Sequence, residues 1–145
     1  VARLVDMGVE PFLISSSVIL VAAQRLCRKV CEACKEKIEL SAEVLKQLNV
    51  DPDRIEPDPK KRVFYRGKGC DKCNQTGYKG RMGVLETLLV DDSIRELILK
   101  RASAYEIKDY AVSKGMTSLR DDAIKKCFAG LTTADEVFRI TSEDE

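Results

Sequence analysis

The sequence predicts an α+β fold in which a cysteine-containing segment with short strands precedes a helical C-terminal region. Two Cys-x-x-Cys pairs stand far apart in the first half of the chain. Residues 82–90 are rich in apolar and β-favouring residues and predict a strand. After residue 90 the apolar residues recur with helical spacing between capping residues and glycines. A chain of 145 residues suits one domain or two small units packed together.

Composition is that of a soluble globular protein, with 44% hydrophobic and 34% charged residues. The net charge of +1 implies neither a nucleic-acid partner nor an anionic membrane surface. The longest apolar stretch, 11–23, is interrupted by three serines and is shorter than a membrane span. Because the sequence starts without a methionine or a signal-peptide pattern, we expect a fragment of a longer chain.

The N-terminal third is predicted to contain two helices. The first covers residues 2–8 and ends at Gly8, and Pro11 suits the first turn of the next. Residues 12–23 are apolar nearly all round, which is typical of a segment buried in a larger body. Residues 24–30 are compatible with a strand or with a continued helix, because seven residues are too few for periodicity to decide.

The middle of the chain is predicted to hold a short helix, a loop and a short strand. Ser41 is a candidate N-cap, with Val44 and Leu48 on one face of the helix that follows. Residues 51–62 hold three of the four prolines and many charges, so we expect an exposed loop. Val63–Tyr65 is a candidate strand that leads to the second cysteine pair.

The C-terminal region is predicted to be helical, with two capping boxes of the form Ser/Thr-x-x-Glu. The boxes are Ser103–Glu106 and Thr133–Glu136. The expected helices are 91–101, 103–114 ending before Gly115, one capped by Ser118 and ending at Gly130, and a last one after Thr133.

Four of the six cysteines form the pairs Cys31/Cys34 and Cys70/Cys73, which we interpret as a metal site. Zinc prefers four tetrahedral ligands, and thiolates are among its strongest. The two-residue spacer lets each pair fold into a tight knuckle, and two knuckles complete the coordination shell. Thirty-five residues separate the pairs, so the ion is expected to tie together the base of an inserted loop.

Residues around the second pair fit this interpretation. Glycines on both sides would supply the unusual backbone angles of a knuckle, at Gly67, Gly69, Gly77 and Gly80. Basic residues would offset the charge of a zinc tetrathiolate, at Lys35, Lys37, Arg66, Lys68 and Lys72. The site would be structural, because four protein thiolates leave no position open for water.

Other interpretations of the cysteines stay open. They are two disulfides, reduced thiols, a redox dithiol, and an iron–sulfur or other thiophilic-metal site. Cys127 lies at helical spacing with Leu119 and Ala123 and is expected in the core. Cys27 is not expected to be a ligand, because the two-residue spacer is the preferred knuckle geometry.

Catalytic constellations are not visible in the sequence. The chain has no histidine, so a Ser/His/Asp triad is excluded, and it has no glycine-rich phosphate loop. Glu86 is a single carboxylate after an apolar run, which is more typical of a surface or interface than of a general base. Asp121 and Asp122 are expected to be solvated or paired with cations rather than to bind metal.

Several segments together resemble the type II secretion and type IV pilus-assembly ATPase family, in its tetracysteine members. The two cysteine pairs match the family's metal motif. The other matching segments are Arg3–Ser17, Ala23–Leu26, Thr76–Arg81, Gly83–Glu86, Gly115–Arg120 and Gly130–Val137. Their order and spacing make the resemblance specific, and Cys27 departs from it, since the family usually has an aliphatic residue there.

The resemblance implies a cytoplasmic, homo-hexameric ATPase peripheral to the bacterial inner membrane. Its RecA-like core would bind ATP and Mg²⁺ and would work on an inner-membrane platform protein and cytoplasmic secretion or pilus components. The family's Walker, Asp-box and His-box motifs precede this region, so the fragment is expected to be inactive alone. Family members dedicated to pilus retraction generally lack the cysteines, which favours assembly or secretion.

Three segments are expected on this basis: the end of a RecA-like core (1–30), a zinc-binding subdomain (31–80), and a strand with a C-terminal helical subdomain (81–145). An alternative is a stand-alone zinc-ribbon module that binds nucleic acid or protein, although the balanced charge disfavours nucleic acid. A redox protein is a third possibility.

Overall fold

The computed structural model describes residues 2–48 and 63–141, which form both helices and strands. The predicted α+β class is therefore confirmed. The elements in chain order are α1 (Ala2–Asp6), α2 (Pro11–Ser17), β1 (Leu20–Val30), β2 (Lys35–Ile38), α3 (Ala42–Gln47), β3 (Phe64–Gly67), a 3-10 turn (Asp71–Cys73), β4 (Tyr78–Leu89), α5 (Asp92–Leu99), α6 (Ala104–Ser113), α7 (Leu119–Phe128) and α8 (Ala134–Thr141).

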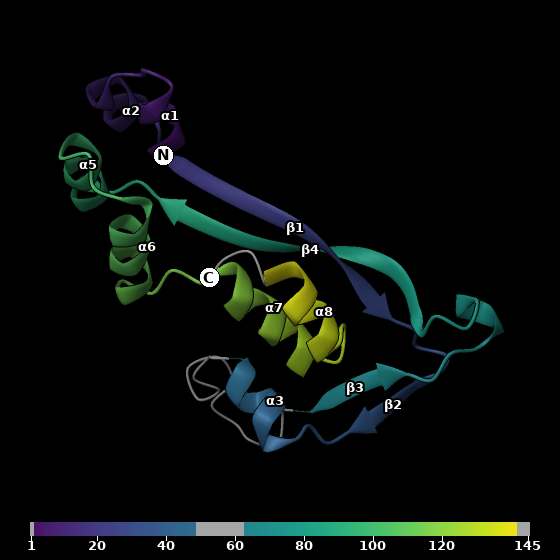
Figure 1. Cartoon of the computed structure of the whole chain (residues 1–145). Helices are drawn as coiled ribbons and strands as arrows, with labels where there is room; N and C mark the ends of the chain where they lie inside the picture. The colour runs from purple at the N-terminus through teal and green to yellow at the C-terminus, as the bar shows by residue number, and fades with distance from the viewer. Residues whose placement is uncertain (1, 49–62, 142–145) are drawn as a thin grey trace. The chain divides into compact units, whose positions relative to one another are not determined.

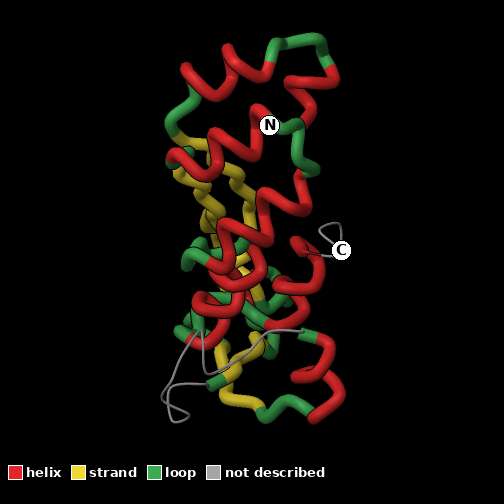
Figure 2. Tube along the Cα trace, turned by 90° about the vertical axis from the view of Figure 1, so that its left-hand side faces the viewer, coloured by secondary structure: helices red, strands yellow, loops and turns green. Residues whose placement is uncertain are grey.

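Helices and strands alternate irregularly along the chain, and Figure 2 shows them by type. Among the described residues, no helix has the length and apolar character needed to cross a bilayer. The expected loop 51–62 lies outside the described residues.

The chain forms two compact units, each built from two separate stretches of sequence. Unit 1 consists of Val1–Ala23 and Glu86–Ser118, and unit 2 of Gln24–Leu85 and Leu119–Glu145. The division falls inside both β1 and β4, which pair with each other as a two-stranded sheet. The three segments expected from the sequence (1–30, 31–80 and 81–145) were assigned by function rather than by compactness, and they stay a prediction.

Unit 1 is held together by an apolar core in which α5 is central. Helix α5 packs on α2 and on α6. The buried members of this core are Ile14, Val90, Ile94, Ile98, Ile107 and Ala111.

Side-chain caps begin both C-terminal helices of unit 1. The Asp91 carboxylate accepts from the Ile94 N–H at 2.8 Å and so caps α5. Ser103 and Glu106 form the predicted capping box, because the Ser103 Oγ accepts from the Glu106 N–H at 3.2 Å and the Glu106 carboxylate accepts from the Ser103 N–H at 2.7 Å. Gly115 follows α6 with φ +95°, the left-handed angle that ends helices.

The N-terminal apolar stretch divides into a helix and a strand. Pro11 begins α2, as predicted, and the helix ends at Ser17 before the chain enters β1. The hydroxyls of Ser15 and Ser16 donate to the Phe12 carbonyl at 3.0 and 2.8 Å, a local bonding pattern that disfavours a long helix. Phe12 and Ile19 are 67% and 70% exposed on this chain.

The described residues of unit 2 contain the strand pair β2–β3, the rest of the long strand pair, and the helices α3, α7 and α8. Strands β2 and β3 are antiparallel, and Lys35 stands opposite Gly67 and Ile38 opposite Phe64. Helices α7 and α8 pack together, and α7 also contacts β3. The buried core of this unit is formed by Cys27, Leu48, Phe64, Val84, Leu119, Ala123, Ile124, Cys127, Phe128, Val137 and Ile140.

The sequence predicted some element limits of unit 2 better than others. The undecided stretch 24–30 belongs to β1, and β4 begins at Tyr78 rather than at residue 82. Ser41 caps α3 through a bond from the Val44 N–H at 3.4 Å. The second capping box is only half formed: the Thr133 hydroxyl accepts from the Glu136 N–H at 3.3 Å, but the Glu136 carboxylate bonds elsewhere.

Candidate metal centre

The four cysteines of the two pairs come together at one place in unit 2. Their sulfurs all lie within 4.8 Å of one another. The Sγ–Sγ distances are 3.9 Å for Cys31–Cys70, 3.9 Å for Cys34–Cys73 and 3.7 Å for Cys70–Cys73. A disulfide holds its sulfurs about 2.05 Å apart, so these cysteines are free thiols in a cluster rather than two bridges.

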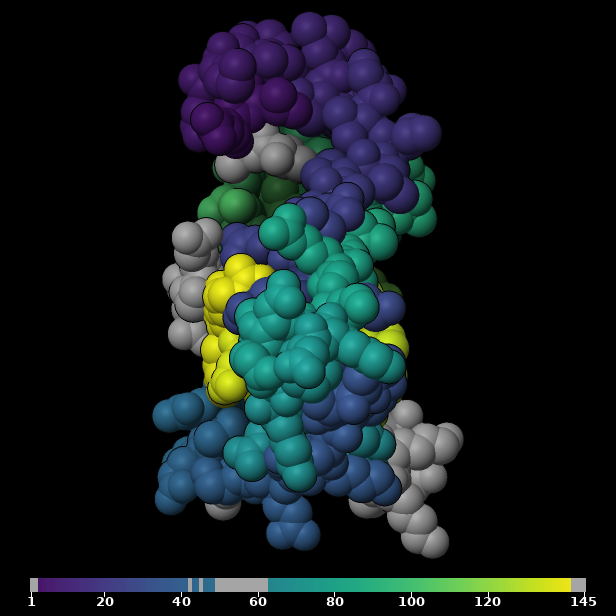
Figure 3. All heavy atoms as spheres, turned by 90° about the vertical axis from the view of Figure 1, so that its right-hand side faces the viewer, coloured from purple at the N-terminus to yellow at the C-terminus, as the bar shows by residue number. Residues whose placement is uncertain are grey.

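Backbone elements place each sulfur. Cys31 directly follows β1, and Cys34 directly precedes β2. Cys70 follows β3 and begins the 3-10 turn that ends at Cys73. The Lys68 N–H donates to the Cys34 carbonyl at 3.0 Å, which joins the two knuckles beside the antiparallel β2–β3 pair. In Figure 3 the teal residues that follow β3 lie at the surface of the face shown.

Backbone N–H groups point at one sulfur in particular. Cys73 Sγ accepts from the N–H of Cys70 at 3.2 Å and from the N–H of Gly77 at 3.3 Å. Burial opposes the charged form of this thiol, but these donors outweigh it and lower the pKa of Cys73 to about 6. For Cys34, burial together with the neighbouring thiols raises the pKa to about 12. Metal binding must therefore displace protons from the cluster.

Glycines permit the close approach of the two knuckles, but in two different ways. Gly69 and Gly77 adopt φ +93° and +76°, as predicted. Gly67 does not have a positive φ and is needed for space instead. A Cβ on Gly67 would lie 2.1 Å from the Gly77 carbonyl oxygen. That oxygen accepts from the Cys31 N–H at 2.9 Å, so the Gly67–Gly77 contact borders the cluster directly.

Several of the basic residues expected to offset thiolate charge pair with carboxylates. Arg66 and Lys68 both contact Glu36 at 2.8 Å, which lowers the pKa of that carboxyl. Lys35 pairs with Glu32 at 3.2 Å and lies over the Tyr65 ring, 4.7 Å from its centre. Much of the local positive charge is thus balanced by glutamates beside the cluster.

The remaining two cysteines belong to the core, as predicted for Cys127. Cys27 and Cys127 are 0% and 1% exposed and share one apolar cluster. Burial raises the pKa of both thiols, that of Cys127 to about 12. Within residues 2–48 and 63–141, neither belongs to the group that could hold a metal.

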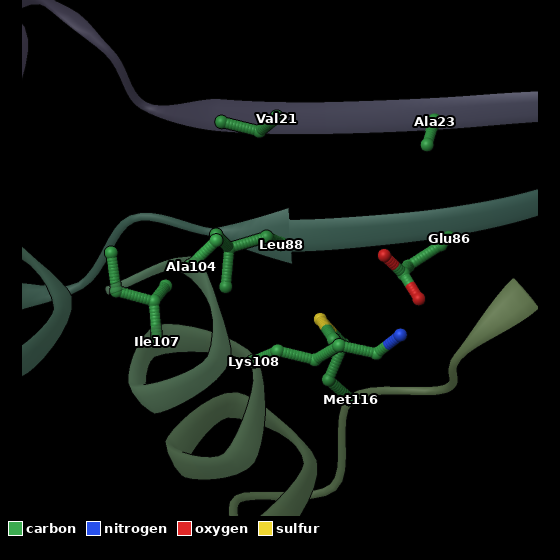
Figure 4. Close-up of a pocket in the computed structure, with 8 residues that line it drawn as sticks. All are labelled: Val21, Ala23, Glu86, Leu88, Ala104, Ile107, Lys108 and Met116. Atoms are coloured by element: carbon green, nitrogen blue, oxygen red, sulfur yellow. The ribbon is translucent and has the colours of Figure 1, made fainter. Parts of the chain in front are cut away.

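Of the other carboxylates singled out in the sequence, Asp121 is buried rather than solvated, whereas Asp122 and Glu86 have ordinary surroundings. Asp122 pairs with Lys126 and accepts from the Leu85 N–H at 2.8 Å. Glu86 lines a pocket of about 210 Å³ in unit 1, shown in Figure 4 with Lys108 and otherwise apolar neighbours. One carboxylate and one ammonium among apolar side chains offer no nucleophile–base pair for catalysis.

Sequence reasoning missed the charged residue at the start of α8. Glu136 is fully buried, and its carboxylate pairs with Arg28 at 2.6 Å and with Arg139 at 2.7 Å. Burial opposes its ionisation, but both guanidiniums and the Arg28 N–H outweigh that effect and lower the pKa of Glu136 to about 2. Its spacing to Arg139 is visible in the sequence, whereas Arg28 lies 108 residues away.

Comparison with known proteins gives the context of this centre. The family described as type II/IV secretion system protein matches residues 1–139. The chain belongs to this family. It is 45% identical over 143 residues to the type IV pilus assembly ATPase PilB of Thermus thermophilus, with 99% of this chain and 16% of the relative covered.

Type II secretion relatives match equally well. The chain is 43% identical over 144 residues to the type II secretion system protein E of Pseudomonas aeruginosa, with 99% of this chain and 27% of the relative covered. It is 45% identical over 143 residues to the type II secretion system ATPase E of Vibrio cholerae, again over 27% of that relative. The chain therefore spans about a quarter or less of the length of these relatives.

Proposed function

We propose that this chain is the C-terminal, non-catalytic part of an ATPase that powers type II secretion or type IV pilus assembly, and that Cys31, Cys34, Cys70 and Cys73 bind a structural zinc ion. The family match and the named ATPase relatives support the first half of the proposal. The convergence of four sulfurs within 4.8 Å carries the second half.

The spacing of the sulfurs fits a zinc tetrathiolate. With Zn–S bonds of about 2.3 Å, a tetrahedron places its sulfurs about 3.8 Å apart. Three of the sulfur pairs lie at 3.7–3.9 Å, close to that value. The donor set of four thiolates also suits zinc, and it leaves no coordination position open for catalysis.

Zinc would supply a closed four-coordinate centre that fixes the two knuckles to each other. The residues of this chain would position the ligands. Cys31 and Cys34 hold the beginning of the excursion between the pairs, and Cys70 and Cys73 hold its end. The N–H groups of Cys70 and Gly77 stabilise negative charge on Cys73 Sγ. Gly67 and Gly77 let the backbones meet.

In the full-length protein, residues 1–30 would complete a RecA-like core and residues 31–80 would form the zinc-binding subdomain. Residues 81–145 would form a strand and a C-terminal helical subdomain. The whole would be a homo-hexamer that uses ATP and Mg²⁺, in the cytoplasm at the bacterial inner membrane. This part would make contacts between subunits or with the membrane platform protein, and it would not take part in ATP hydrolysis.

Elemental analysis of the purified chain tests the metal centre. We expect one zinc per chain, and we expect Cys31→Ser and Cys70→Ser to lose it because each removes one thiolate. Full zinc content and unchanged thermal stability in both variants would refute the ligand assignment. Iron in place of zinc would keep the site but change its metal.

The motor assignment needs the full-length protein. We expect that protein to form hexamers and hydrolyse Mg-ATP, and we expect this chain alone to show no turnover. A chain that hydrolyses ATP by itself would contradict the non-catalytic role.

A further inference from the structure

Glu136 is a buried charged residue of unit 2 that pairs with two guanidinium groups. Its side chain is 0% exposed. One carboxylate oxygen accepts from the Arg28 guanidinium at 2.6 and 2.9 Å, and the other accepts from the Arg28 backbone N–H at 2.8 Å. Arg139 donates to both oxygens at 2.7 Å. The carboxylate thus fixes both the side chain and the backbone of Arg28, near the end of β1.

The residues just before Glu136 hold the two strands that lead to and from the cysteines. The Val30 N–H donates to the Leu131 carbonyl at 3.0 Å. The hydroxyls of Tyr78 and Thr133 are 2.8 Å apart. Val30 is the last residue of β1 and Tyr78 the first residue of β4. Figure 1 shows α8 beside α7 and these strands.

Arg28 connects the two sets of contacts. Its guanidinium stacks on the Tyr78 ring, 4.2 Å from the ring centre, while its side chain also binds Glu136. Its carbonyl accepts from the Thr132 hydroxyl at 2.8 Å. The start of α8, the end of β1 and the start of β4 therefore form one hydrogen-bonded group.

From this group the cysteine cluster is one residue away on β1, and on the β4 side it is reached through Gly77. Cys31 follows Val30, and its N–H donates to the Gly77 carbonyl at 2.9 Å. Gly77 precedes Tyr78, and its N–H donates to Cys73 Sγ at 3.3 Å. A shift of Val30 or Tyr78 would move Cys31 itself and the Gly77 N–H that donates to Cys73 Sγ.

We propose that Glu136 is a positioning residue for the metal centre. It holds the end of β1 at Val30 and the start of β4 at Tyr78, so that the four sulfurs stay in binding geometry. This inference rests on the proposed zinc site. A buried ion pair is often no more stabilising than apolar side chains of the same size, so a role in fixing geometry accounts for its position better than stability alone. Binding of zinc and docking of α8 then favour each other, because coupling between two sites is reciprocal.

Chelator-driven zinc release from the folded chain tests the proposal. Glu136→Gln keeps the volume but loses the charge and one acceptor oxygen. We expect it to release zinc about tenfold faster, the low end of the effect of removing outer groups of a metal site. Val137→Ala is the matched control, because Val137 is also 0% exposed on α8 but lies in the apolar core. It should lower stability and leave the release rate within about twofold.

A milder variant guards against a folding failure. Tyr78→Phe removes only the hydroxyl contact with Thr133 and keeps the ring under Arg28. Its zinc release should be faster by a factor of about two to three, a fraction of the full outer-group effect. Wild-type release rates in both Glu136→Gln and Tyr78→Phe would overturn the proposal. Equal acceleration in Glu136→Gln and Val137→Ala would also overturn it, because general loosening would then explain the effect.

Hydrogen exchange of the metal-free protein separates this inference from the zinc assignment. Glu136→Gln should speed exchange at the amides of Val30, Cys31 and Gly77, and should leave α5 and α6 of unit 1 unchanged. Unchanged exchange at those three amides would refute the positioning role whether or not zinc binds. A wild-type chain without zinc, with altered exchange in the variant, would refute the zinc assignment alone.

Discussion

The contact between Gly67 and Gly77 gives a prediction in which two physical effects have opposite signs. Gly67 lies in β3 without a positive φ, so alanine can adopt its backbone angles. Reduced entropy of the unfolded chain alone would then make Gly67→Ala more stable by about 0.4–1 kcal/mol. The structure predicts the reverse, because the new Cβ would lie 2.1 Å from the Gly77 oxygen and 2.6 Å from its Cα.

The loss of unfolding free energy in Gly67→Ala can be estimated from the backbone shift that the new Cβ requires. A carbon needs roughly 3.2 Å or more from a carbonyl oxygen, so one backbone has to shift by about 1 Å, at a strain of about 1–3 kcal/mol. Two bonds of Gly77 depend on its position, one to the Cys31 N–H and one to Cys73 Sγ. At about 1 kcal/mol each, their loss brings the total to about 3–5 kcal/mol.

Urea unfolding at neutral pH with zinc present measures this loss, and zinc release into a chelator measures its effect on the cluster. Gly83→Ala is the matched control, since it is also a glycine-to-alanine change in a strand. The three atoms nearest its new Cβ all belong to the Gln24 side chain, with Nε2 at 2.8 Å, and that exposed side chain can move away. We expect Gly83→Ala to be neutral or slightly stabilising. If Gly67→Ala matches this control in both assays, the close approach of the knuckles is wrong.

Three further predictions concern single side chains. Glu136→Gln should lower the free energy of unfolding by about 3 kcal/mol at pH 7, the equivalent of a carboxyl pKa lowered from 4.5 to about 2. Because the folded-state pKa is the lower one, the difference in unfolding free energy between variant and wild type should be constant above about pH 5 and shrink as the pH falls from about 4.5 toward 2. Denaturation in the presence of chelator across that pH range measures this difference. A difference that does not change with pH would contradict the ion pairing of Glu136. Ser103→Ala should cost about 1 kcal/mol, seen as faster amide exchange in the first turn of α6. Cys127→Ala should keep one zinc per chain in elemental analysis, and loss of zinc there would place Cys127 in the metal site.

Local rules predicted the parts of the fold that short stretches of sequence decide. The Ser103–Glu106 capping box and the left-handed Gly115 came directly from their spacing, because both act within one helical turn. The clustering of the four cysteine sulfurs was also predictable, since a two-residue spacer favours a knuckle and two knuckles can share one ion.

Contacts between distant residues were not predictable in the same way. From the sequence, Glu136 was expected to complete a capping box. Its carboxylate instead accepts hydrogen bonds from the Arg28 N–H and from the guanidiniums of Arg28 and Arg139. Gly67 looked like a residue chosen for its backbone angles, whereas its role depends on Gly77 on another segment. Residues 24–30 form a strand that pairs with β4, and a pattern within seven residues cannot reveal such a distant partner.

The burial of Cys27 and Cys127 makes thiol labelling a test of whether the protein is still folded. Both are shielded by the core of unit 2 and hold their protons tightly, so an alkylating reagent has neither access to them nor a thiolate to attack. Stripping the metal from folded protein should therefore leave Cys27 and Cys127 unlabelled. Mass spectrometry of the labelled chain then distinguishes an emptied cluster from an unfolded protein, in which all six would react.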